Sequence, residues 1–415
     1  MHIALRQVLA YSLALMKSQD KPADETQENF ALMTATETVI VIGAGASGLA
    51  AADALSRRGL PVVVLEKEAH VAGPWRHRHQ RLSLNTHRAF SSLPGLPYPP
   101  GTPAFPSREQ VIAYLERYVG ERGLTVEFGF EVVAIARDGD GWTVTAADGR
   151  RRRAGHVVFA TGHDKVPWTP DWPGAAGFPG RIVHAADFGR VEDYAGKRVL
   201  VVGAGNSGFD VLNHLSDGTA EKIWLSVRQG PSLLPKRIGN VAVHRFAGFM
   251  DMLPTAVTDL AIAATQRAVL GDLRRFGVPK APRGGATRLR DEQIAIPVDD
   301  GAVAAMRAGK IGIVAPLARF DGDRVILADG GALDADVVIA ATGYRTGLET
   351  LLGGLGVLDE ATGRPLASGG EPTGQKGLWF TGMKPTIMGH FHSATVEGRA
   401  LAAAIAAENK GVGGT

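Results

Sequence analysis

Four short runs of apolar residues stand out along the chain, each closely followed by a glycine or a charged side chain. They are Val39–Ile42, Val62–Leu65, Val199–Val202 and Ile223–Leu225. Runs without a polar position are typical of strands buried on both faces, as in a parallel sheet covered by helices. A glycine-rich turn and a helical stretch separate the two runs of each pair. The pattern therefore predicts an α/β fold with two β-α-β units.

The first glycine-rich turn reads Gly43-Ala44-Gly45-Ala46-Ser47-Gly48. Here Gly43 permits the tight turn, Gly45 lets backbone N–H groups approach a pyrophosphate, and Gly48 lets the helix pack on the strand. The helix N-terminus adds a partial positive charge for the phosphates. Glu66 ends the second strand, at a spacing that suits hydrogen bonds from free ribose hydroxyls, as in FAD. The residues expected to bind this dinucleotide are Gly43, Gly45, Ala46, Ser47, Gly48, Glu66 and Lys67.

A second turn of the same kind reads Gly203-Ala204-Gly205-Asn206-Ser207-Gly208. The position that matches Glu66 is Ser226, and Arg228 stands two residues later. An acid would repel a 2′-phosphate, whereas a hydroxyl beside a guanidinium would accept one through charge-assisted hydrogen bonds. The second site is therefore predicted to prefer NADPH to NADH, although Arg228 could also be an ordinary surface cation. The residues expected to bind NADPH are Gly203, Gly205, Asn206, Ser207, Gly208, Ser226 and Arg228.

Another internal repeat supports two similar units. An Ala-Asp-Gly turn at 147–149 precedes a buried strand ending in Thr161-Gly162, and one at 328–330 precedes a strand ending in Thr342-Gly343. Each Thr-Gly pair is expected to let the chain pass close to a cofactor. Proline-rich crossings are expected at Pro167–Pro179 and within Gly284–Pro297. The predicted division is a leader at 1–37, an FAD domain at 38–166 and 299–410 with an inserted NADPH domain at 167–298, and a tail at 411–415.

Composition narrows the chemistry. The chain of 415 residues has no cysteine, which excludes disulfides, thiolate zinc sites, Cys-ligated iron–sulfur clusters and dithiol relays. Its 45 basic and 42 acidic side chains give no case for nucleic-acid binding. The pair His390 and His392 lacks a supporting carboxylate pattern, so no metal site is expected. The apolar stretch Val8–Met16 is too short to span a bilayer. A cytoplasmic enzyme without a membrane segment is expected, and it could form a homodimer.

The segment Phe178–Phe188 matches the pattern F-x-G-x-x-x-H-x-x-x-aromatic and lies between the two glycine-rich turns. This combination resembles the class B flavoprotein monooxygenases, which include the flavin-containing and Baeyer–Villiger enzymes. Stretches that most resemble the YUCCA-type branch are Trp75–Arg78 through Leu96–Pro99, Gly271–Gly277, and Pro297–Asp299. Two positions depart from familiar patterns, Ala185 after the motif histidine and Phe188 at its end.

The resemblance implies two Rossmann-like domains, with the NADPH domain inserted in the FAD domain. It implies that NADPH reduces FAD, and that a flavin C4a-(hydro)peroxide oxygenates a small lipophilic substrate with O₂. The reaction could be N- or S-oxygenation, a Baeyer–Villiger reaction or oxidative decarboxylation of a 2-oxo acid. Asn85 then lies beside the flavin, where its amide holds the peroxide or the substrate without titrating. By the same resemblance Trp75 forms a wall near the flavin, and His184 positions the linker and NADPH.

Less specific interpretations remain open at this point. Asn85 could be a turn residue, and the apolar stretch Met252–Phe276 could line a substrate tunnel or simply cover the second unit. The chain could also be an FAD-dependent NADPH oxidoreductase that passes electrons to a protein or a quinone. A third possibility is a non-catalytic accessory protein that binds both nucleotides. The absence of cysteine removes only the dithiol version of these alternatives.

Overall fold

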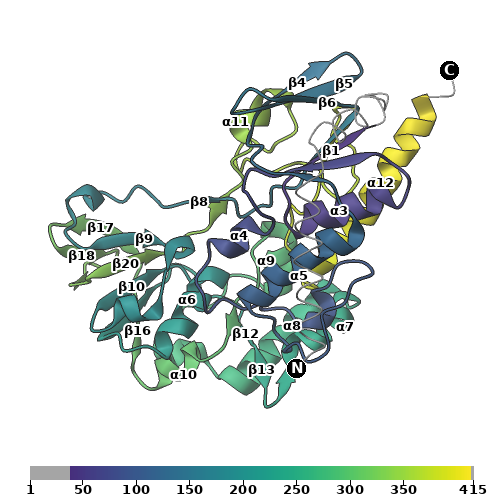
Figure 1. The fold of residues 1–415 in the computed structure, drawn as a ribbon. Coiled ribbons are helices and arrows are strands. Elements are labelled where there is room, and N and C mark those ends of the chain that lie inside the picture. The colour runs from purple at the N-terminus through teal and green to yellow at the C-terminus, as the bar shows by residue number, and fades with distance from the viewer. Residues whose placement is uncertain (1–37, 413–415) are drawn as a thin grey trace, which may run out of the picture.

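The computed structural model describes residues 38–412. The predicted leader, residues 1–37, and residues 413–415 of the predicted tail lie outside the described part. Two α/β units are visible, with β8 on the connection between them (Figure 1). Both units have a parallel sheet, so the predicted fold of two Rossmann-like units is confirmed.

The first unit is built on a five-stranded parallel sheet in the order β22-β7-β1-β2-β3. The strands of this unit are β1 Val39–Ile42, β2 Val62–Leu65, β3 Val126–Glu127, β4 Val132–Asp138, β5 Gly141–Ala146, β6 Arg151–Ala154, β7 His156–Phe159 and β22 Leu378–Phe380. The helices are α3 Ala46–Ser56, α4 Gly73–Arg76, α5 Arg108–Arg122, α11 Glu349–Leu352 and α12 His390–Val412, with 3-10 turns Arg88–Phe90 and Gly353–Leu355. α12 continues through 412, so the predicted start of the tail at 411 was wrong.

Both faces of this sheet are covered, which explains its uninterrupted apolar strands. Along β1, Val39 and Val41 face a core shared with α3, α5 and α12, whereas Ile40 and Ile42 face a core shared with β5. α3 and α12 approach closely because small residues meet there. A Cβ added to Gly398 would lie 3.0 Å from the backbone oxygen of Ala50.

The second unit repeats this plan in the order β16-β11-β10-β20-β9. Its strands are β9 Arg181–His184, β10 Arg198–Val202, β11 Lys222–Ser226, β16 Ile311–Val314, β17 Leu317–Asp321, β18 Arg324–Leu327, β19 Ala332–Leu333 and β20 Val337–Ala340. The helices that flank this sheet are α6 Asn206–Ser216 and α10 Ala302–Arg307, with 3-10 turns Ala175–Gly177, Ala185–Asp187 and Val191–Tyr194.

The predicted end of the second unit at residue 298 was wrong. Strand β16 pairs with β11 and strand β20 pairs with β10, although both had been assigned to the FAD domain. The repeated turn, strand and Thr-Gly pair therefore marks one strand in each sheet, β7 in the first and β20 in the second. The return crossing lies at β21 Tyr344–Arg345, which pairs antiparallel with β8 Val166–Pro167. The two crossings thus run side by side.

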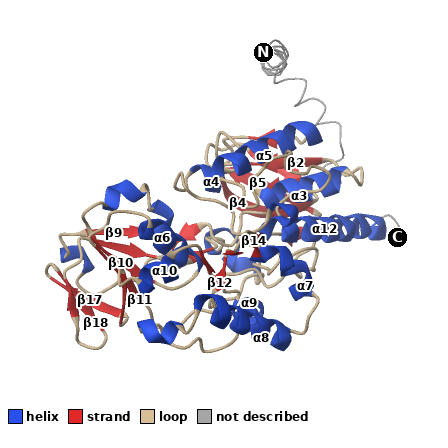
Figure 2. Cartoon of the chain, turned by 90° about the horizontal axis from the view of Figure 1, so that it is seen from below, coloured by secondary structure: helices blue, strands red, loops and turns tan. Residues whose placement is uncertain are grey.

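A long excursion between β11 and β16 extends the second unit toward the first. It contains β12 Leu234–Pro235, β13 Arg237–Ile238, β14 Val241–Ala242, α7 Ala247–Asp251, α8 Thr255–Thr265, α9 Gly285–Glu292 and β15 Val298–Asp299, with a π-helical turn Gln266–Leu270 and 3-10 turns Val243–Phe246 and Leu273–Phe276. Figures 1 and 2 show α7, α8 and α9 away from the second sheet, with α7 near α12. Met252 and Leu260 are exposed, so part of the apolar stretch Met252–Phe276 faces solvent. No helix in the described part of the chain is long and apolar enough to cross a membrane.

Candidate active site

The first glycine loop joins β1 to α3 in the shape that its sequence predicts. Gly43 has φ +108°, a conformation that residues with a Cβ rarely adopt. A Cβ on Gly48 would lie 1.9 Å from the carbonyl oxygen of Gly43, so only glycine permits this contact between turn and helix. Around Gly45, in contrast, an added Cβ would meet no atom of the described residues within 4 Å. The N-terminus of α3 is therefore open to a ligand.

Glu66 lies beside this loop at the carboxyl end of β2. One of its carboxylate oxygens accepts a hydrogen bond from the N–H of Ala44 at 2.7 Å, and the other accepts one from the N–H of Glu68 at 3.0 Å. These contacts orient the carboxylate, and each oxygen keeps a lone pair for a ribose hydroxyl. The ammonium group of Lys67 is half exposed and lies 3.6 Å from the carboxylate of Glu68.

Three buried polar atoms near this loop have no hydrogen-bond partner among the described residues: Thr161 Oγ1, His163 Nδ1 and His390 Nδ1. Burial lowers the pKa of His390 to about 4, so its imidazole is neutral at pH 7. Its Nε2 lies 3.1 Å from Ser47 Oγ, which fixes the ring beside the loop. Because buried polar atoms are nearly always paired in native proteins, these atoms indicate a polar ligand at this place. FAD fits, and sequence reasoning had identified Thr161 but neither histidine.

We expect the substitution Gly45→Ala to weaken FAD binding without unfolding the protein. The backbone of Gly45 is extended, with φ −84°, and the new methyl group meets only the space that a pyrophosphate would occupy. FAD binding is measured as flavin absorbance per mole of purified chain. The melting temperature of the FAD-free protein shows whether the fold is retained. Gly120→Ala is the control, since its Cβ on α5 also meets no described atom within 4 Å. Full flavin content in Gly45→Ala would contradict the assignment.

The second glycine loop, between β10 and α6, has the same geometry. Gly203 has φ +110°, a Cβ on Gly208 would lie 1.9 Å from the oxygen of Gly203, and Gly205 faces open space. A cavity of about 460 Å³ opens beside the loop, a volume suited to part of a dinucleotide. Its walls come from this loop, the end of β11, α9, the first crossing and the residues that follow β20. They include Gly203, Gly205, Ser226, Arg228, Arg288, Trp168, Thr342 and Gly343.

Ser226, which the sequence predicts to contact a 2′-phosphate, lines this cavity and also contacts the backbone. The Ser226 hydroxyl is buried, donates its only proton to the carbonyl oxygen of Ala315 at 3.1 Å, and accepts from the N–H of Leu317 at 2.9 Å. Through these contacts Ser226 joins β11 to the start of β17. Its role toward the phosphate stays a prediction, and Arg228 is the second predicted residue for that group.

Two arginines line this cavity. Arg228 is exposed and forms no ion pair with any described residue. Arg288, on α9, is largely buried and pairs with Glu292 at 3.0 Å, and it donates to the side-chain oxygen of Gln229 at 3.4 Å. Sequence reasoning missed Arg288 because its segment had been interpreted as a linker. The structure thus places a second guanidinium on the wall of the same cavity.

His184 lies at the end of β9 and contacts the return crossing. Its Nε2 is 3.0 Å from the carbonyl oxygen of Gly343, and its Nδ1 accepts from the N–H of Ala186 at 3.0 Å. Burial lowers its pKa, so the neutral ring makes both contacts at pH 7. Thr342 makes a further hydrogen bond between the two crossings, because its hydroxyl donates to the backbone oxygen of Trp168 on the first crossing. Both ring nitrogens are occupied, which leaves none for proton transfer.

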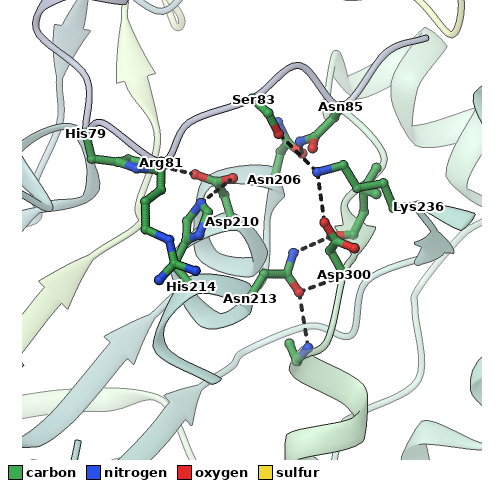
Figure 3. Close-up of polar contacts among 12 residues, drawn as sticks. His79, Arg81, Ser83, Asn85, Asn206, Asp210, Asn213, His214, Lys236 and Asp300 are labelled. Atoms are coloured by element: carbon green, nitrogen blue, oxygen red, sulfur yellow. Dashed lines mark hydrogen bonds and ion pairs between the residues drawn. The ribbon is translucent and has the colours of Figure 1, made fainter. Parts of the chain in front are cut away.

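Asn85 lies where the two units meet (Figure 3). Its side-chain amide donates to the side-chain oxygen of Asn206 at 3.2 Å, at the N-terminus of α6 and next to Gly205. Sequence reasoning had proposed Asn85 for the flavin and Asn206 for NADPH but could not predict that they touch. Trp75 is partly buried on α4, against the first core, and Gly162 follows β7 with φ +79°.

His244 fastens the long excursion of the second unit to the first. Its Nδ1 accepts from the backbone N–H of His87 at 3.1 Å, and its Nε2 donates to the carbonyl oxygen of Ile387 at 3.1 Å. Through these contacts His244 links two segments of the first unit, the one that follows Asn85 and the one that precedes α12. They require the neutral ring, because protonation would remove the acceptor on Nδ1.

We therefore expect acid to destabilise the folded protein through His244. Burial lowers its pKa to about 4 in the folded state from an ordinary value of 6.5. The unfolded chain thus binds a proton first, and stability that is complete above pH 6.5 is lost as the pH falls through about 4. Urea unfolding of the flavin-bound protein at several pH values measures this. His244→Gln should give a shallower dependence, and parallel pH profiles would contradict the role.

The architecture and the two glycine loops are typical of a flavoprotein that uses FAD and NADPH. Residues 40–231 match the family described as pyridine nucleotide-disulphide oxidoreductase, although the chain has no cysteine. The indole-3-pyruvate monooxygenase YUCCA1 of Oryza sativa subsp. japonica is 35% identical over 338 residues, which cover 80% of this chain and 82% of the relative. The probable indole-3-pyruvate monooxygenase YUCCA8 of Arabidopsis thaliana is 34% identical over 74% of each chain.

A flavin-containing monooxygenase from Stenotrophomonas maltophilia has a similar solved structure, with a TM-score of 0.69 and 27% identity over 89% of this chain and 99% of that one. The chain belongs to the flavin monooxygenase family that contains the YUCCA enzymes. It is a monooxygenase that uses FAD and NADPH, and it acts on a small molecule with O₂. Family membership removes the alternatives of an electron-transferring oxidoreductase and of an accessory protein.

Proposed function

We propose that this monooxygenase decarboxylates a small aromatic 2-oxo acid in the cytoplasm. The net reaction is R–CO–COOH + O₂ + NADPH + H⁺ → R–COOH + CO₂ + H₂O + NADP⁺. One oxygen atom enters the new carboxyl group, the bond between the two carbonyl carbons breaks, and NADPH is oxidised. Two observations support this proposal: the relatives are named indole-3-pyruvate monooxygenases, and positively charged side chains lie near Asn85.

The observation that carries this proposal is the positive field beside Asn85. Burial lowers the pKa of His87, and the charges of Arg245, Arg88 and Arg237 lower it further. His87 stands two residues from Asn85, so the charges that act on its ring lie near this part of the loop. A positive field of this kind favours a carboxylate over a neutral or cationic substrate.

Aromatic rings lie among these cations. The ring of Phe105 lies beneath the ammonium of Lys236 at 5.2 Å and the guanidinium of Arg237 at 4.8 Å. Phe90 packs edge-on against His244, with ring centroids 5.5 Å apart. Cations and aromatic faces together suit a substrate with a carboxylate and a flat ring.

Each part of the chain then has a defined task. The loop from Gly43 to Gly48 and Glu66 bind FAD, while the loop from Gly203 to Gly208 and Arg228 bind NADPH. Bound FAD, reduced by NADPH, supplies the activation of dioxygen. Asn85 holds oxygen or substrate through a neutral amide, oriented by its contact with Asn206. The crossings, fastened by His184, set the distance between the two sites.

A substrate comparison tests the proposal. Indole-3-pyruvate and phenylpyruvate should give the shortened acid and CO₂ with one NADPH oxidised per product, whereas a cyclic ketone, a thioether and a tertiary amine should not. Arg237→Ala should raise the KM for the 2-oxo acid several-fold and leave the KM for NADPH unchanged. Arg319→Ala, which removes an exposed cation of the second unit, is the control. Efficient turnover of the neutral substrates alone would contradict the proposal.

A further inference from the structure

Three side chains of metal-ligand type meet between the two units, about one turn of α6 from the contact of Asn85 with Asn206. His79 belongs to the loop after α4, and Asp210 and His214 belong to α6 (Figure 3). His79 Nε2 lies 3.1 Å from Asp210 Oδ2, and His214 Nε2 lies 3.7 Å from Asp210 Oδ1. One ligand atom from each residue falls within 4.8 Å of the others. None of the three residues has a task in the proposed reaction.

The surrounding structure holds these side chains in place. Asp210 and His214 are four residues apart and therefore share one face of α6. The imidazole of His79 is only 5% exposed and packs edge-on against Phe188, with ring centroids 5.4 Å apart. The His79 and His214 rings are 4.7 Å apart and nearly perpendicular. The arrangement is thus largely formed before any ligand arrives.

The chemistry of this set suits a divalent transition metal. Two imidazole nitrogens and one carboxylate are common ligands of Zn²⁺, with a water in the fourth position. Metal–ligand bonds of about 2.1 Å in a tetrahedron place neighbouring donor atoms roughly 3.4 Å apart. The separations of 3.1 Å from His79 to Oδ2 of Asp210 and 3.7 Å from His214 to Oδ1 of the same carboxylate lie close to this value.

We propose that His79, Asp210 and His214 bind one Zn²⁺ ion, or a similar ion such as Co²⁺ or Ni²⁺, that bridges the two units. The nearby guanidinium of Arg81, which lies 3.5 Å from a carboxylate oxygen of Asp217, weakens the binding of a cation at this place. The loop that carries His79 continues to Asn85, and α6 begins at the NADPH loop. A bridging ion would therefore restrain the two cofactor sites relative to each other.

Zinc binding to the flavin-bound protein tests this proposal. The protein is treated with a chelator, dialysed against ZnCl₂, and assayed for zinc per chain by atomic absorption. The wild type should retain one more zinc than His79→Ala or His214→Ala, and zinc should raise the melting temperature of the wild type alone. His77→Ala is the matched control, because its exposed imidazole contacts Glu68 instead.

His214→Gln provides a second variant that can keep a hydrogen bond to Asp210 while weakening the metal site. Flavin content and circular dichroism establish that each variant is folded. Equal zinc in the wild type and in the His79→Ala/His214→Ala double variant would overturn the proposal and leave a hydrogen-bonded contact between the units. Loss of zinc in His77→Ala would overturn it as well, because binding would then be non-specific.

Discussion

Replacing Arg228 by alanine should raise the KM for NADPH by about 10- to 100-fold and leave the KM for NADH almost unchanged. Arg228 is exposed at the cavity beside the second glycine loop and has no ionic partner among the described residues. Its charge is thus available to a 2′-phosphate, which only NADPH has. Initial rates of NADPH and NADH oxidation in the purified variant measure the two constants.

Two further variants make this experiment specific. Arg275→Ala removes an exposed cation that does not line the cavity and should change neither constant. Arg288→Ala should raise the KM for NADPH less than Arg228→Ala, because its guanidinium already pairs with Glu292. An equal rise for NADPH and NADH in Arg228→Ala would show that this residue does not recognise the 2′-phosphate.

The substitution Asn85→Ala should retain bound FAD and NADPH oxidation but divert oxygen to hydrogen peroxide. The share of NADPH that ends as peroxide should rise several-fold, since removing a general hydrogen-bonding group typically costs about 1–3 kcal/mol. Alanine has neither the amide N–H nor the carbonyl that could hold oxygen or substrate, and it loses the contact with Asn206. Parallel assays of NADPH, peroxide and product give the ratio.

Gln80→Ala is the control for this substitution, because it removes an exposed amide from the same loop. Asn206→Ala should give an intermediate peroxide share, as it leaves the amide of Asn85 in place without its orienting partner. An unchanged peroxide share in Asn85→Ala would leave Asn85 as a turn residue.

Much of the fold could be predicted because its determinants are local. The apolar run Val39–Ile42 packs into cores on both faces of the first sheet, and the two glycine loops have equivalent conformations. The C-terminal boundary of the second unit could not be predicted from such local patterns. The apolar residues of a short strand such as Val337–Ala340 would suit the interior of either sheet. Only the pairing of this strand with β10 shows which sheet it joins.

In the site, too, the sequence predicts the positions of residues in a motif but not the contacts of their side chains. Ser226 occupies the position that the motif predicts, but its hydroxyl is engaged by Ala315 and Leu317, far along the chain. His390 carries no motif, and the structure alone places it beside Ser47 of the first glycine loop. Such contacts depend on the path of the chain through both units, which a local pattern does not contain.

By itself, the sequence determined two dinucleotide-binding units, the absence of thiol chemistry, and the residues that form each glycine loop. These features rest on interactions between residues that are close in the chain. The tertiary structure decided where the second unit ends, that Asn85 meets Asn206, and that His79 lies beside Asp210 and His214. The end of the second unit depends on which strands pair within its own sheet. The other two contacts depend on how the two units pack against each other, since their partners belong to different units.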